Sequence, residues 1–159
     1  MRSQFQPKDL LESLVRLEQN GETFYREMAK KFSTDKESAD FFTFLADQET
    51  HHEALYKKLS SQIDNNQAID EEFDDEYKAY IQNLIEQIFN LDSSKVGDDT
   101  IDIYRFAIGL EKDTILFIKE VKSIVPNFEP ELLDKVEAEE RGHIKLIQQW
   151  YDSHINDIK

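Results

Sequence analysis

Two stretches of the chain, Glu49-Thr50-His51-His52 and Glu140-Arg141-Gly142-His143, share the pattern Glu-x-x-His. Each lies in the middle of a long segment with the hydrophobic period of an α-helix, where leucine, isoleucine or phenylalanine would be expected. Residues three positions apart share one face of a helix, so each pattern directs a carboxylate and an imidazole to the same side. Because charged side chains at inward positions are rare unless paired, these two stretches indicate a specific site.

Four segments carry the alternating three- and four-residue spacing of helices that pack in a bundle. The second and fourth contain the Glu-x-x-His patterns, and the first and third each contain one inward glutamate, Glu18 and Glu111. In the third segment the spacing predicts these inward positions: Ile101, Tyr104, Ile108, Glu111, Ile115 and Ile118. The sequence therefore predicts an all-α protein with four long helices around a core that contains charged groups.

The breaks between the segments predict how the helices connect. Ser33-Thr34-Asp35 predicts a turn and a helix cap between segments one and two, and Pro126 to Pro130 separates segments three and four. At about 1.5 Å rise per residue, folding each pair about its turn brings its three polar residues to a common height. The link over about 64–99 contains a further amphipathic stretch and is long enough to span the bundle. A four-helix bundle with one long crossover connection is therefore expected, with segments two and three parallel.

Composition limits the possible partners and compartments. The 159 residues suit one domain, expected over 1–159, and the absence of cysteine excludes disulfides, thiolate metal sites and iron–sulfur clusters within them. The formal net charge of −15 argues against nucleic acids and anionic membranes as partners and favours metal cations. No apolar run approaches the roughly 18 residues that a membrane span needs. The N-terminus also lacks the apolar region of a signal peptide, so a cytoplasmic protein is expected.

The inward polar residues form a ligand set for two metal ions. Four carboxylates and two imidazoles without sulfur suit iron or manganese, and zinc also binds such ligands. We predict that Glu49 and Glu140 bridge the two metals and that Glu18 and Glu111 are terminal ligands. The complete predicted set, which would act in catalysis through the metals, is Glu18, Glu49, His52, Glu111, Glu140 and His143. The alternative interpretation is a group of stray charges with two hydrogen-bonded core histidines.

With this ligand pattern the chain resembles the ferritin-like di-iron proteins, and more specifically the rubrerythrin group, from about Gln6 to Ile158. The resemblance implies a carboxylate-bridged centre of two iron ions that reacts with hydrogen peroxide or dioxygen, and it implies a homodimer. The chain departs from the group in two respects. It has no cysteine-containing rubredoxin domain, so a separate electron-transfer protein is expected as donor, and Thr114 replaces an additional glutamate after Glu111.

Three further residues are candidates for supporting the ligands. Tyr25 and Tyr104 are each seven residues from a predicted ligand and would hydrogen-bond a ligand, relay an electron or simply fill the core. Glu137, one turn before Glu140, is the candidate for an additional carboxylate, whereas the neighbouring Glu139 is expected on the surface.

Two other functions remain open at this point. One is oxidation of ferrous iron for storage or detoxification, of which storage would require a large hollow oligomer. The other is a non-catalytic helical scaffold, because this fold serves many functions.

Overall fold

The structure, a computed structural model, describes residues 6–63 and 75–155, and helices dominate that part of the chain. It contains no strand within these two ranges. The long helices correspond to the four predicted segments, with one additional helix in the crossover. In chain order the helices are α1 (Pro7–Lys31), α2 (Lys36–Gln62), α3 (Asp75–Phe89), the short 3-10 helix η1 (Ser93–Lys95), α4 (Thr100–Ile124) and α5 (Pro130–Ile155).

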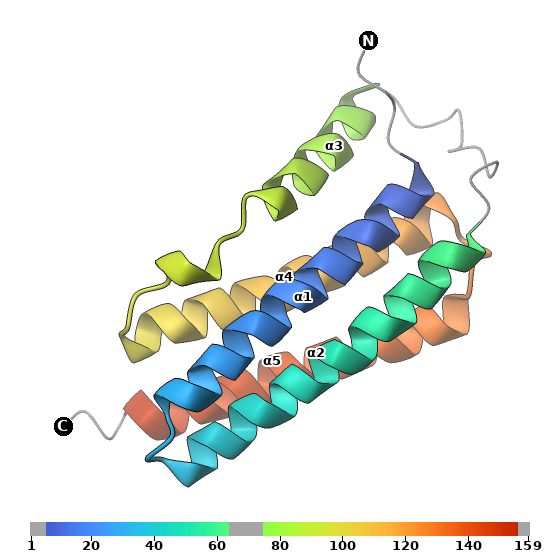
Figure 1. Cartoon of the computed structure of the whole chain (residues 1–159). Helices are drawn as coiled ribbons and strands as arrows, with labels where there is room; N and C mark the ends of the chain where they lie inside the picture. Colours follow the sequence, from blue (N-terminus) through green and yellow to red (C-terminus); the bar gives the residue numbers. More distant parts are fainter. Residues whose placement is uncertain (1–5, 64–74, 156–159) are drawn as a thin grey trace.

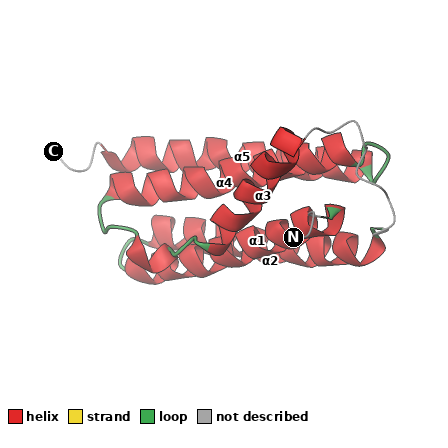
Figure 2. Cartoon of the chain, turned by 90° about the horizontal axis from the view of Figure 1, so that it is seen from above, coloured by secondary structure: helices red, strands yellow, loops and turns green. Residues whose placement is uncertain are grey.

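The four long helices form a bundle of two antiparallel hairpins (Figure 1). Figure 2 shows the α1–α2 hairpin in one layer and the α4–α5 hairpin in the other. Helix α1 packs against α2 and α4, and α5 packs against α4 and α2. Since a long connection separates the hairpins, α2 and α4 run in the same direction (Figure 1). This arrangement confirms the predicted ferritin-like bundle with a single crossover.

Helix α3 occupies the crossover and packs on the outside of the bundle against α1. Its contact face is formed by Ile81, Ile85 and Ile88, which recur at intervals of three and four residues. The first part of the predicted crossover, 64–74, lies outside the described residues. Among the helices that are described, none combines the length and the apolar character needed to cross a membrane.

Capping and turn residues fix the two hairpins. Asp35 is the N-cap of α2, where its side chain accepts a hydrogen bond from the Ser38 backbone N–H. Trp150 and His154, near the end of α5, also hydrogen-bond the Ser38 side chain, which ties the two helix ends together. In the second hairpin Glu129 has a positive φ of 43° immediately before α5 begins at Pro130. Both breaks therefore lie where the sequence predicts them.

The buried face of α4 differs from the predicted one. Ile101, Tyr104 and Ile115 are only half-buried, whereas Ile108, Glu111 and Ile118 are buried as predicted. The reason is that α4 packs against both α1 and α5, so its buried stripe is wider than a simple two-helix seam. The buried positions that the prediction omitted are Ile103, Ala107, Leu110, Thr114, Phe117, Val121 and Ile124.

Candidate metal centre

Each long helix of the bundle contributes at least one of the six predicted ligands. Helices α1 and α4 each provide one glutamate, and α2 and α5 each provide a glutamate and a histidine from one Glu-x-x-His turn. All six side chains are buried among apolar residues, with no more than 4% of any residue exposed. The predicted ligands are Glu18, Glu49, His52, Glu111, Glu140 and His143. Six ionisable groups thus meet in the buried core of the bundle.

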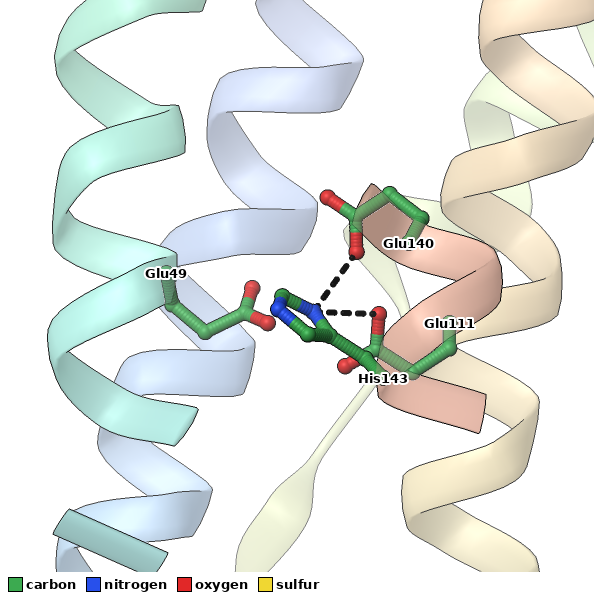
Figure 3. A group of neighbouring side chains, drawn as sticks. All are labelled: Glu49, Glu111, Glu140 and His143. Carbon is green, nitrogen blue, oxygen red and sulfur yellow. Dashed lines mark hydrogen bonds and ion pairs between the residues drawn. The ribbon is translucent and has the colours of Figure 1, made fainter. Parts of the chain in front are cut away.

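The six side chains form two groups that have one member in common. Glu49, Glu111, Glu140 and His143 each offer an atom within 4.8 Å of the others, and Figure 3 shows them converging from α2, α4 and α5. The second group consists of Glu18, His52 and Glu140 under the same criterion. Glu140 therefore lies between two potential metal positions, as expected for a bridging carboxylate. Glu49 belongs to one group only, so its role as a second bridge stays a prediction.

Both histidines direct Nδ1 toward the carboxylates. The Nδ1 of His143 lies 3.2 Å from Glu140 Oε2 and 3.6 Å from Glu111 Oε2 (Figure 3). The Nδ1 of His52 lies 2.6 Å from Glu140 Oε1. The two imidazole rings are 5.7 Å apart and nearly parallel. The centre therefore has an approximate twofold arrangement, in which equivalent nitrogen atoms approach Glu140 from two helices.

Crowding of carboxylates changes their protonation in the metal-free protein. Burial raises the pKa of Glu18 well above its ordinary value, and the neighbouring charges of Glu140 and Glu111 raise it further. Burial, followed by repulsion from Glu140, raises the pKa of Glu111 to about 8. Without metals these two groups therefore hold protons at neutral pH.

Glu140 and His143 show the opposite balance, since each has a partner of opposite charge. Burial alone would raise the pKa of Glu140, but hydrogen bonds from Glu111, His143 and His52 keep it well below the ordinary value. Burial alone would lower the pKa of His143, but Glu111 and Glu140 raise it to about 10. Glu140 therefore stays ionised beside Glu111 and His143, which both hold protons. An ionised carboxylate in this position is suited to act as a ligand shared by two metals.

Several polar atoms of the site lack hydrogen-bond partners. Neither oxygen of Glu18 has a hydrogen-bond partner within the described part of the chain, and the Oε1 of Glu49 also lacks one. Buried polar atoms are seldom left unpaired, because each costs about 1–3 kcal/mol. Two metal cations would coordinate these oxygens and neutralise the carboxylates. The residues present therefore fit a pair of divalent metal ions.

Glu139 forms a hydrogen bond with the ring nitrogen of His52 that faces away from Glu140. The Nε2 of His52 lies 2.8 Å from Glu139 Oε2, while Nδ1 faces Glu140. Such a carboxylate fixes the orientation and tautomer of a metal-binding histidine. The sequence analysis expected Glu139 on the surface and did not predict its contact with His52. Its side chain is 40% exposed, and the available signal was its position in the Glu-Glu-x-x-His stretch of α5.

We expect Glu139→Gln to reduce metal affinity by about 10- to 100-fold, the usual effect of losing an outer carboxylate. The amide retains the size of the side chain but removes the charge that holds the His52 ring. Competition against a chelator would measure the effect, with Glu131→Gln on the same helix as an exposed control. Equal affinities of Glu139→Gln and the wild type would show that His52 needs no such support.

Gly21 provides the space that Glu49 occupies. A Cβ atom at residue 21 would lie 2.8 Å from Glu49 Oε2 and 3.0 Å from its Cδ, which is too close for either atom. At Gly142, by contrast, an added Cβ would meet no atom of the described chain within 4 Å. A side chain at residue 21 would therefore require the Glu49 carboxylate to move, whereas one at residue 142, inside the second Glu-x-x-His turn, would not disturb the site.

These two glycines predict opposite outcomes for the same substitution. Gly21→Ala would displace the Glu49 carboxylate and lower metal occupancy, despite the higher helix propensity of alanine. Gly142→Ala is expected to retain both metals and to stabilise the protein by up to about 1 kcal/mol. Metal analysis and thermal melting of both variants test this contrast. If Gly21→Ala retained full metal occupancy, the close approach to Glu49 would not matter for binding.

The other candidate residues lie in different surroundings. The Tyr25 hydroxyl donates a hydrogen bond to Glu111 Oε1 at 2.9 Å and so holds a predicted ligand. The Tyr104 hydroxyl instead hydrogen-bonds Gln148, which places it away from the ligands. Glu137 is buried but forms ion pairs with Lys119 and Arg141, so its carboxylate is used elsewhere.

Thr114 occupies the position of the additional glutamate that the resemblance implies. Its hydroxyl donates to the Leu110 carbonyl of its own helix at 3.0 Å. A fifth carboxylate is therefore not available from this position.

A rubrerythrin family model matches residues 9–151 of the 159, which includes all six predicted ligands. The chain therefore belongs to the rubrerythrin family, whose members are ferritin-like di-iron carboxylate proteins and generally oxidoreductases. Neither the search of curated proteins nor the search of solved structures gave a match.

Proposed function

We propose that this protein is an oxidoreductase that reduces hydrogen peroxide, or alternatively dioxygen, at a carboxylate-bridged pair of iron ions. The observation that supports it most is the position of Glu140, which belongs to both ligand groups in the bundle core. The proposed ligands of one ion are Glu18 and His52, and those of the other are Glu111 and His143. Glu140 would bridge them, with Glu49 as a second bridge.

The two ferrous ions would supply the two electrons that, with two protons, convert one peroxide molecule into two water molecules. The protein residues orient and neutralise the centre. Four carboxylates balance the charge of two divalent cations, Tyr25 fixes Glu111, and Glu139 fixes His52. The apolar core excludes bulk water, which strengthens the electrostatic interactions inside the site.

A pocket next to His52 offers a route for a small oxidant. Its volume is about 460 Å³, and it lies between α2 and α5. His52 and Glu139 line it together with Lys135, which provides a cationic side chain at a predominantly acidic protein surface. The oxidant would therefore approach the centre from the side of Glu18 and His52.

We propose a separate electron-transfer protein as donor; the 159 residues themselves contain no cysteine that could ligate an iron–sulfur cluster. We also propose a homodimer, as the resemblance implies. Manganese or zinc would fit the same ligands, but only a redox-active metal would support the proposed reaction.

Rapid mixing of the anaerobic iron-loaded protein with peroxide or dioxygen tests this function. Absorbance changes should be faster with peroxide, and Glu49→Ala should slow them by at least about 100-fold if the carboxylate binds both ions. Faster oxidation by dioxygen would instead favour an oxidase or a ferroxidase. Unchanged peroxide consumption in Glu49→Ala would rule out the proposed centre.

A further inference from the structure

The hydroxyl group of Tyr56 is a polar atom at the centre that the ligand set does not explain. Tyr56 follows His52 by one turn of α2, is fully buried, and has its ring 6.2 Å from the His52 ring. No described residue forms a hydrogen bond with its hydroxyl. Because leaving a buried hydroxyl unpaired is costly, this atom indicates a partner that is not part of the protein.

The surroundings of Tyr56 indicate which half of the site it serves. Burial raises the pKa of Tyr56 well above its ordinary value, and Glu18 contributes most among the nearby charges, followed by Glu140 and Glu111. Glu18 also has two oxygens that no described donor reaches. Metal coordination would use the Glu18 oxygens, but it would still leave the Tyr56 hydroxyl without an acceptor.

The contrast with Tyr25 shows why the two tyrosines have different roles. Both rings are fully buried and both approach the carboxylates. The Tyr25 hydroxyl is already used, since it donates to Glu111 at 2.9 Å. The Tyr56 hydroxyl has no hydrogen-bond partner among the described residues, and its ring lies 6.2 Å from that of His52, which lines the pocket between α2 and α5. It is therefore available to a small acceptor that enters from this pocket.

We propose that the Tyr56 hydroxyl donates a hydrogen bond to the small oxygen-containing oxidant in the half of the site formed by Glu18 and His52. This inference rests on the proposed function and adds a residue that contacts the substrate. The tyrosine hydroxyl is a suitable donor here, because it offers one hydrogen bond to an acceptor without adding charge to a site that already contains several charged groups.

Azide binding to the oxidised, iron-loaded protein tests the inference without relying on turnover. Azide is a small anion that accepts hydrogen bonds, and titration of the visible absorbance gives its dissociation constant. We expect Tyr56→Phe to weaken azide binding by about 5- to 10-fold, as for one lost hydrogen bond. Tyr104→Phe is the matched control, because it removes a tyrosine hydroxyl that is bonded to Gln148 away from the ligands. Its azide affinity should equal that of the wild type.

Iron content and metal-free melting distinguish this role from a structural one. Tyr56→Phe should bind the same amount of iron, and its metal-free form should melt at or above the wild-type temperature, because an unpaired hydroxyl is removed. Equal azide affinity in Tyr56→Phe and wild type would overturn the inference, and so would a clearly lower metal-free melting temperature. A wild-type protein that binds no iron would instead overturn the proposed function and the inference together.

Discussion

Glu140→Gln is expected to lower iron affinity by more than about 100-fold, beyond the usual effect of losing an outer-shell residue. Glu140 belongs to both ligand groups, so one substitution affects both metal positions. The amide is nearly isosteric with the carboxylate but removes the anion that His52 and His143 face. Anaerobic titration with ferrous iron would measure the loss.

Glu137→Gln is the matched control for this variant. Glu137 lies one turn earlier on α5 and is also buried, but its carboxylate pairs with Lys119 and Arg141 outside the centre. Its replacement should reduce stability and leave iron binding unchanged. If both variants lost iron affinity to the same extent, the loss would follow from replacing any buried glutamate of α5. It would then not show that Glu140 is shared by two metals.

Removing the metals is expected to lower the melting temperature by at least about 15 °C at neutral pH. A ligand that binds only the folded state at one thousand times its dissociation constant contributes about 4 kcal/mol per site. Two such sites correspond to about 8 kcal/mol, and each kcal/mol shifts melting by about 2–4 °C in a protein of this size. Calorimetry with and without a chelator would measure the difference.

The size of this metal effect should grow as the pH rises from 5 to 8. In the metal-free protein, the folded-state pKa values of Glu18 and Glu111 lie above their unfolded values. Their contribution to stability is therefore complete below about pH 4 and is lost as the pH rises, through about 8 for Glu111. His143 acts in the same direction, since its contribution is lost as the pH rises through about 10.

Glu140 has the opposite dependence, because its folded-state pKa is depressed and its contribution is lost only in acid. Over pH 5 to 8 the metal-free protein should therefore become less stable, while metals bind more tightly as protons leave the ligands. Melting temperatures of both forms across this range provide the measurement. A metal effect that was constant or decreased with pH would contradict the assigned protonation states.

The cluster of buried carboxylates and histidines was predictable from sequence because charge interrupts a helical hydrophobic pattern. Glu18, Glu49, Glu111 and Glu140 occupy positions where an apolar residue would otherwise pack, and two short turns bring them to one height. The crossover was predictable from its length and its pattern. About 36 residues can span the bundle, and the apolar residues between Ile81 and Ile88 have the period of an amphipathic helix.

Other features depend on side-chain directions that periodicity does not specify. Glu139 lies beside a predicted ligand in sequence, but its hydrogen bond to His52 on α2 depends on how α5 faces that helix. Tyr56 fits an inward stripe whether or not its hydroxyl has a partner. The wider buried face of α4 arises because α4 contacts two helices, and the sequence of α4 alone does not state how many neighbours it has.

The most direct test of a centre bridged by Glu140 is an anaerobic titration with ferrous iron, followed by Mössbauer spectroscopy of the oxidised protein. A shared carboxylate predicts that binding ends at about two iron ions per chain, as in other bundle sites of this type. It also predicts that the two ferric ions are magnetically coupled. Binding of a single iron, or two ferric ions without coupling, would contradict a carboxylate-bridged pair.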